Sequence, residues 1–169
     1  MNNKIVKEVI SYALIIAAAI LIKLFIFTPI RVNGTSMLPN LKDGDIMILN
    51  EIGYRINGVK RFDIVVAHVK GERLIKRVIG LPGETIEFKY NKLYVNGTLI
   101  EENFDHDDTK DFSLEDIKVD KIPDNYYFLV GDNRNNSKDS RVIGLVHKSD
   151  ISGKASIIIF PFSRIGSVK

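Results

Sequence analysis

The sequence contains no cysteine. This absence excludes disulfide bonds, thiol catalysis and cysteine-ligated zinc, and it leaves the redox compartment of the protein undetermined. Runs of basic residues are also missing, and the net charge of +3 is small for 169 residues. Because proteins that bind nucleic acids usually carry a basic stretch, the composition argues against a nucleic-acid partner. The length allows one domain, or one domain preceded by a membrane anchor.

The longest apolar stretch lies close to the N-terminus, from Val9 to Phe27, and reads VISYALIIAAAILIKLFIF. A helix of these 19 residues would be about 28 Å long, which is close to the thickness of the hydrocarbon core of a bilayer. Its one charged residue, Lys23, lies near the end, where the side chain can extend to the membrane interface. A cleavable signal peptide would be shorter and would end in a small-x-small site, and a buried helix of a soluble domain would show a polar face. We therefore predict a single transmembrane anchor over residues 9–27.

The charges on either side of the anchor predict its orientation. Lys4 and Lys7 precede it, and basic residues are typical of the cytoplasmic side of a membrane span, whereas Arg31 on the far side weakens this assignment. We expect a cytoplasmic N-terminus over residues 1–8 and an extracytoplasmic domain over 28–169. The protein would then be a single-pass protein of the cell membrane, with the lipid bilayer as a partner.

Short apolar runs rich in Val, Ile, Phe and Tyr make up most of the remaining chain, and turn signals separate them. Runs of this length and composition are typical of strands. Asn96-Gly97 interrupts one of them and predicts a tight hairpin. Because no helix-length periodic segment lies between the runs, we predict a mostly β, antiparallel fold. The predicted strands are residues 45–50, 62–69, 73–80, 85–90, 92–100, 126–131 and 154–160.

One acidic segment departs from this pattern. Residues 101–120 carry nine acidic side chains against Lys110 and Lys118. A stretch of this kind is usually solvated, so we expect residues 101–122 to form a variable acidic insertion at the surface. Its DHDD motif at 105–108 is compatible with a metal site, but a surface loop is the simpler interpretation, and we assign no metal.

Ser36 lies in the stretch VNGTSMLPN (32–40), which suits either a turn residue or a nucleophile. A nucleophilic serine needs a base to take its proton, and that base is commonly a histidine. His68 falls in an apolar strand, His106 in the acidic segment and His147 near a loop. None of the three has a local setting that marks it as a base.

A lysine can serve instead, provided that burial lowers its pKa from about 10.4 towards neutrality. Lys76, in the predicted strand RLIKRVIG (73–80), is flanked by apolar residues. Arg77 follows it and points to the opposite face of the strand. The pattern leaves two arrangements open: Lys76 is buried beside the nucleophile, or it lies on the solvent face while Arg77 extends along the other.

The segment GDNRNNSKDSRVIG (131–144) is dense in side chains that form hydrogen bonds. This composition is typical of a polar turn. A loop of this kind can also order a neighbouring site, for example through a hydroxyl that holds a neutral lysine in place.

Three motifs in this order, GTSMLPN, KRVIGLPGE (76–84) and GDNRNNSKDSRVIGLV (131–146), resemble the sequence boxes of type I signal peptidases, most closely the short Gram-positive-like bacterial branch. The resemblance covers the anchor and nearly all of the β domain. It implies the antiparallel β fold of Ser/Lys proteases, without metal or cofactor. It also implies a membrane-anchored serine endopeptidase that removes N-terminal signal peptides from exported preproteins after small-x-small sites. The translocation machinery is a further expected partner.

The resemblance assigns a role to individual residues. It makes Ser36 the nucleophile, Lys76 the general base and Ser137 the residue that orients the lysine. Asp139 and Arg141 would form a structural ion pair behind the site. Shallow apolar pockets and strand edges would bind the substrate, and the pocket residues that it implies are Val32, Met37, Leu41, Leu74 and Ile75.

Some positions match the family pattern and others depart from it. Gly44 and Asp45 match its Gly-Asp motif, whereas Asn40 and Glu84 replace the more usual threonine and aspartate. Gly34 stands where some relatives have a hydroxyl that binds the oxyanion. The backbone N–H of the nucleophile is then the main identifiable donor.

Three rival functions fit parts of the pattern. A catalytically inactive, membrane-anchored paralogue of the same fold would bind exported peptides without cleaving them. A self-cleaving repressor with a Ser/Lys pair would carry a DNA-binding domain where this chain has an apolar span. In a membrane-tethered scaffold both residues would be incidental.

Overall fold

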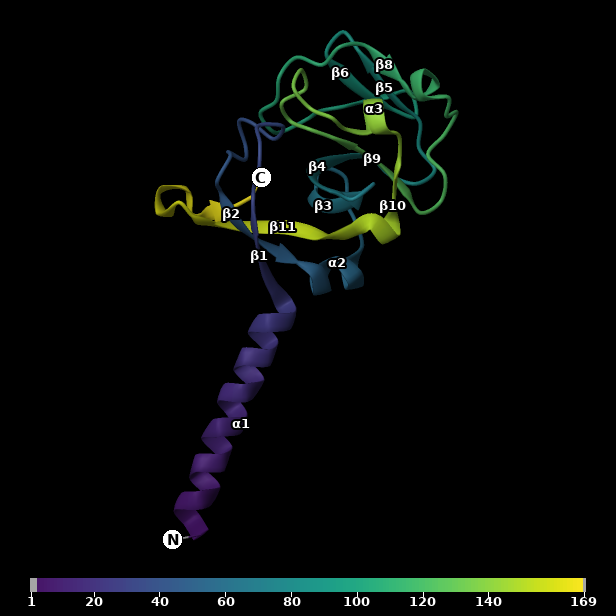
Figure 1. Ribbon diagram of the computed structural model, residues 1–169. Coiled ribbons are helices and arrows are strands. Elements are labelled where there is room, and N and C mark those ends of the chain that lie inside the picture. Colours follow the sequence, from purple (N-terminus) through teal and green to yellow (C-terminus); the bar gives the residue numbers. More distant parts are fainter. Residues whose placement is uncertain (1–2, 169) are drawn as a thin grey trace.

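The computed structural model describes residues 3–168, and it describes the side chains of all of these except residues 3, 18–27 and 52. A long helix, α1 (Asn3–Ile26), projects from a β domain that contains the rest of the chain (Figure 1). Within the described residues, no helix combines the length and the hydropathy needed to cross a membrane. The predicted anchor over 9–27 lies partly outside the described side chains.

The larger of two sheets forms the centre of the β domain. Its strands lie in the order β1, β2, β11, β3, β4, β9 and β10, and β12 pairs with β11. Every pairing is antiparallel. The strands are β1 (Phe27–Arg31), β2 (Ile46–Asn50), β3 (Ile64–Val69), β4 (Glu72–Gly80), β9 (Tyr126–Val130), β10 (Val146–His147), β11 (Ile151–Phe160) and β12 (Gly166–Ser167).

A smaller antiparallel sheet lies at the end of the domain away from α1 (Figure 1). Its order is β7, β6, β5 and β8. The prediction of a mostly antiparallel β fold is therefore confirmed. The strands are β5 (Ile86–Lys89), β6 (Lys92–Val95), β7 (Thr98–Ile100) and β8 (Phe112–Ser113).

All seven predicted runs contain strands, and Asn96-Gly97 joins β6 to β7 as expected. The sequence did not reveal β1, because this short segment shares Phe27 with the apolar stretch and contains Pro29, and only pairing with β2 makes it a strand. It also missed α2 (Glu51–Asn57), which is too short to show a period and is capped by the Asn50 side chain. The remaining short elements are α3 (Ser140–Ile143), η1 (Leu114–Ile117), η2 (Lys148–Asp150) and η3 (Phe162–Arg164).

Most acidic side chains of the segment are exposed, as its composition predicts, but parts of the segment pack on the domain. The Glu102 side chain is 5% exposed and lies 2.5 Å from the guanidinium of Arg134. The same guanidinium donates to the hydroxyl of buried Thr109 at 2.6 Å. Leu114 and Ile122 are buried in the apolar cluster of the smaller sheet. Buried cations and apolar residues elsewhere in the chain therefore hold these parts of 101–122 on the domain, while the rest of the segment lies at the surface.

Gly80 gives a test of packing between the two sheets. A Cβ at this position would lie 2.4 Å from Ile122 Cδ1 and 2.9 Å from Phe128 Cβ. We expect Gly80→Ala to lower the free energy of unfolding by about 1–3 kcal/mol, because overpacking forces neighbours to move. Gly166→Ala is the matched control, since a Cβ there meets nothing within 4 Å. Denaturant unfolding that gives equal values for the two variants would contradict this account.

Candidate active site

The nucleophile segment is held to the sheet on both sides of Ser36. The N–H of Val32 donates to the carbonyl of Asp45 at 2.8 Å, and the N–H of Gly44 donates back to Val32 at 3.0 Å. Gly34 adopts φ +89°, a conformation that favours glycine, and its N–H donates to the Asp43 carboxylate at 2.7 Å. These bonds fix the turn that presents Ser36.

Lys76 Nζ lies 2.7 Å from Ser36 Oγ and donates to it. The same ammonium nitrogen donates to the Ile75 carbonyl at 3.0 Å. Lys76 is 4% exposed and Arg77, on the opposite face of β4, is 1% exposed. The solvent-facing alternative for Lys76 is therefore wrong. Lys76 and Arg77 are both buried, because the domain covers both faces of β4 over residues 75–80.

Burial lowers the pKa of Lys76 from its ordinary value to about 8. The negative charges of Asp139 and Asp132 act in the opposite direction and favour the ammonium form. Removal of water from the amine outweighs this attraction. A substantial fraction of Lys76 is then neutral slightly above physiological pH, and only the neutral amine can accept a proton from a hydroxyl.

Asp139 and Arg141 form the ion pair that the sequence predicts. Arg141 Nε and Nη2 donate to the two carboxylate oxygens of Asp139 at 2.9 and 2.8 Å. The N–H of Gly131 donates to the same carboxylate at 3.0 Å. Burial alone would raise the pKa of Asp139, but the bonds from Arg141 and Gly131 hold it below the ordinary value. The carboxylate is therefore charged and fixes the loop behind the site.

Ser137 lies close to Ser36, but the expected bond to Lys76 is not present. Its hydroxyl is buried and has no hydrogen bond of normal geometry among residues 3–168, although it lies near enough to Asp139 to help lower the pKa of that carboxyl. A Cβ at Gly131 would lie 2.2 Å from Ser137 Oγ and 2.5 Å from the Ser36 carbonyl oxygen. Glycine at 131 therefore permits this close approach. The orienting role of Ser137 stays a prediction.

Sequence reasoning missed the residues that join the polar loop to the nucleophile segment. The Asn133 backbone N–H donates to the Ser36 carbonyl, and its side-chain amide donates to the Thr35 carbonyl, both at 3.1 Å. Asn136 donates to the Thr35 hydroxyl at 3.1 Å. The high density of Asn in GDNRNN was the available signal. It could not identify partners that lie about a hundred residues away in the chain.

A buried ion pair supports the same loop from the other face of β4. Arg77 Nε and Nη2 donate to the two Asp132 oxygens at 2.8 and 2.7 Å. The Asn40 side chain donates to Asp132 at 2.7 Å. Asn40, one of the departures from the family pattern, thus connects the nucleophile segment to this ion pair. Glu84, the other departure, accepts from the Leu81 N–H at 2.7 Å and closes a turn.

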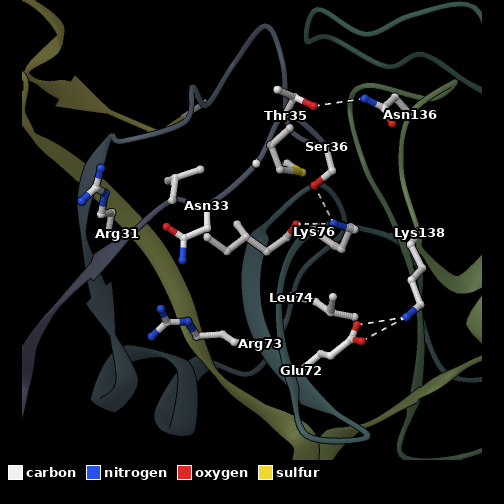
Figure 2. A pocket seen from close by; sticks show the side chains of 14 residues that line it. Arg31, Asn33, Thr35, Ser36, Glu72, Arg73, Leu74, Lys76, Asn136 and Lys138 are labelled. Carbon is white, nitrogen blue, oxygen red and sulfur yellow. Dashed lines mark hydrogen bonds and ion pairs between the residues drawn. The ribbon is translucent and has the colours of Figure 1, made fainter.

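A pocket of about 310 Å³ opens beside Ser36 and Lys76. Figure 2 shows both side chains pointing toward each other from its wall. Among the predicted pocket residues, Leu41 is fully buried in the core and does not line this pocket, and its contact with substrate stays a prediction. The substrate contacts of the others stay predictions, and those that line the pocket are Val32, Met37, Leu74 and Ile75.

The three histidines have partners away from this pair. His68 Nδ1 lies 2.9 Å from the Ser152 hydroxyl, and His147 Nδ1 lies 2.7 Å from that of Ser149. His106 Nδ1 lies 2.7 Å from the Asp107 carbonyl. Within residues 3–168, no group of three or more His, Asp and Glu side chains is placed to hold a metal ion.

Comparison with known proteins gives consistent matches. The sequence profile of the family "Signal peptidase, peptidase S26" matches residues 5–160. Signal peptidase IB of Staphylococcus aureus (strain COL) is 38% identical, over 96% of this chain and 93% of the relative. Signal peptidase I of Bacillus caldolyticus is 40% identical over 85% of each chain. A crystal structure of a signal peptidase I from Enterococcus faecalis V583 matches with a TM-score of 0.53 and 36% identity, over 57% of this chain and 95% of that one.

The Arg77–Asp132 pair predicts a large loss of stability when its carboxylate is removed. The two side chains are 2% and 0% exposed. Asp132→Asn leaves a buried guanidinium without its counter-charge, so we expect the free energy of unfolding to fall by about 3–5 kcal/mol. Glu72→Gln breaks the exposed ion pair between Glu72 and Lys138 and should change the free energy of unfolding by at most about 1 kcal/mol. Similar losses in both variants, measured by denaturant unfolding, would contradict the assignment.

Proposed function

The chain belongs to the signal peptidase family, peptidase S26, and on that premise we propose that Ser36 is its nucleophile and Lys76 its general base. Members of this family remove signal peptides from preproteins, and this chain is a serine protease of that kind. The observation that carries the residue assignment is the 2.7 Å contact between Ser36 Oγ and a lysine amine that is 4% exposed.

The first step of the proposed reaction forms an acyl-enzyme. Neutral Lys76 takes the proton of Ser36 while Oγ attacks the scissile carbonyl carbon of the preprotein. The carbonyl oxygen becomes negative in the tetrahedral intermediate. The backbone N–H of Ser36, which donates to no backbone or side-chain acceptor among the described residues, supplies one hydrogen bond to it.

Collapse of the intermediate breaks the carbon–nitrogen bond. The protonated Lys76 gives its proton to the leaving amine, which becomes the N-terminus of the mature protein. Water then attacks the Ser36 ester, and Lys76 accepts its proton. Lys76 returns that proton to Ser36 Oγ as the carbon–Oγ bond breaks, and the signal peptide leaves with a new carboxylate. One lysine thus serves as base and acid in both halves of the reaction, which requires its pKa to lie near the working pH.

Helix α1 supports a membrane anchor over residues 9–27. Most of the large apolar side chains from Ile5 to Ile16 are more than half exposed on the projecting helix. Val6 is the exception and is half-buried. A bilayer would cover such a surface favourably. Nine residues lead from Phe27 to Ser36, so the nucleophile lies within roughly 30 Å of the helix end. We propose an N-terminus in the cytoplasm and a catalytic domain on the extracytoplasmic face, where exported preproteins and the translocation machinery meet it.

Small-x-small cleavage sites fit the proposed cleft. The lining residues Val32, Met37, Leu74 and Ile75 are apolar and lie beside the reacting pair. With polar residues they line the pocket of about 310 Å³, and their apolar surface suits contact with a small side chain. An inactive peptide-binding paralogue is less well supported, because both reactive groups are present at hydrogen-bond distance.

Substitution of the reacting pair tests the assignment. We expect Ser36→Ala and Lys76→Met each to lower kcat for preprotein cleavage by at least about a thousandfold, because each removes a group that acts in every turnover. The measurement is cleavage of a preprotein in detergent micelles. Lys92→Met, an exposed lysine on the smaller sheet, is the matched control and should retain wild-type turnover. Wild-type turnover by either of the first two variants would exclude the pair.

The pKa of Lys76 predicts the pH dependence. Because the neutral amine is the active form, kcat/KM should rise tenfold per pH unit below about 8, where the pKa of Lys76 lies, and level off above it. The profile of kcat/KM between pH 6 and pH 10 checks this. A continued rise to about pH 10, where an ordinary lysine titrates, would mean that Lys76 is not desolvated in the working enzyme.

A further inference from the structure

The charges around the pocket are distributed unevenly. Figure 2 shows the side chains of Arg31 and Arg73 on one side of it and those of Glu72 and Lys138 on the other. Glu72 and Lys138 neutralise each other, with a nitrogen–oxygen distance of 3.0 Å. The first side therefore carries two positive charges, whereas the second carries none in total.

Neither arginine is committed to a partner within the protein. Arg31 and Arg73 are exposed, and among residues 3–168 no carboxylate lies within ion-pair distance of either guanidinium. Each guanidinium keeps its donors available for an anion. Both belong to the strands that lead to the reacting pair: Arg31 ends β1 before Ser36, and Arg73 lies three positions before Lys76 in β4.

The edge of β4 beside the pocket is open. Residues 72–77 pair with β3 on one side, whereas β9 pairs on the other side only with Arg77, Val78 and Gly80. Within the described part of the chain, no strand covers the second edge over residues 72–76. An extended peptide can add there through its main chain. Since a strand advances about 3.4 Å per residue, a peptide whose scissile residue lies at Lys76 reaches Arg73 about three residues earlier.

The position of the anchor gives the direction of that peptide. β1 runs from the end of α1 to Arg31, and the chain then continues to Ser36. The part of a preprotein that precedes its cleavage site comes from the same bilayer. It therefore approaches from the side of Arg31 and places its residues before the scissile bond along this wall.

We propose that Arg31 and Arg73 determine substrate specificity by favouring an acidic side chain about four residues before the scissile bond and disfavouring a basic one there. The inference rests on the proposed function, because it needs the scissile carbonyl at Ser36. A carboxylate at this position meets two guanidiniums that have no other partner, and a lysine meets like charges. Because the arginines are exposed, salt screens the effect.

Cleavage of three preproteins that differ only at this position tests the proposal. With Glu, Gln or Lys at the fourth residue before the scissile bond, wild-type kcat/KM in neutral detergent should fall in that order, by roughly twofold to fivefold per step. The steps should shrink in 0.5 M salt, well above the physiological ~0.15 M. Arg73→Glu brings the total charge of the two side chains to zero and should flatten the order, and Arg31→Gln leaves one positive charge and should make the steps smaller.

Controls separate the possible outcomes. Arg55→Glu makes the same charge change on exposed α2, outside the pocket, and should leave the order unchanged. An order that Arg73→Glu leaves unchanged would overturn the proposal. The proposal would also be overturned if the charge changed kcat/KM only when it is placed four residues after the scissile bond. It would be overturned as well if kcat/KM depended on anionic lipid added to the detergent and not on the charge of the substrate. In these cases Ser36-dependent cleavage of the Gln substrate leaves the proposed function standing. If no substrate is cleaved in a Ser36-dependent way, the proposed function itself fails.

Discussion

Burial of the Lys76 amine is the constraint on which the rest of the site depends. An ammonium group loses much of its hydration when it is buried, and the neutral amine becomes the form that the fold tolerates best. Lys76 reaches this state because the sheet and the polar loop leave it 4% exposed. The same burial places its nitrogen against the Ser36 hydroxyl at 2.7 Å. Desolvation and contact therefore come from one arrangement of strands and loops.

Two carboxylates lie near this amine, and ion pairs with arginines limit how far they raise its pKa. Asp139 and Asp132 both favour the charged form of Lys76. Each is also held by a guanidinium of its own, Arg141 for the first and Arg77 for the second. These ion pairs offset most of the negative charge that would otherwise stabilise an ammonium. They also carry the loop that bonds to the Ser36 carbonyl, so the same interactions set the electrostatics and the geometry of the site.

Several parts of the site follow from local pattern, and others do not. Apolar flanks identify Lys76 as a lysine that can be buried, and residue order together with family resemblance identifies Ser36 as its partner. Asp139 and Arg141 lie two positions apart in the sequence, and the family resemblance likewise predicts their ion pair. Asn133 and Gly131 were missed because their importance lies in contacts with Ser36, far away in the chain. The family resemblance places Leu41 near the substrate pocket, whereas its burial in the core depends on how distant residues pack around it.

The sequence by itself determined the class of fold, seven strand positions, the hairpin at Asn96-Gly97 and the two residues proposed to react, because alternation, turn chemistry and motif order are local properties. Only the tertiary structure decided that β1 is a strand, that the acidic segment packs around Arg134, and that Lys76 and Arg77 are both buried. It also left Arg31 and Arg73 together on one side of the pocket. Each of these depends on which distant residues come into contact, and burial and charge pairing between them are settled only when the sheets pack.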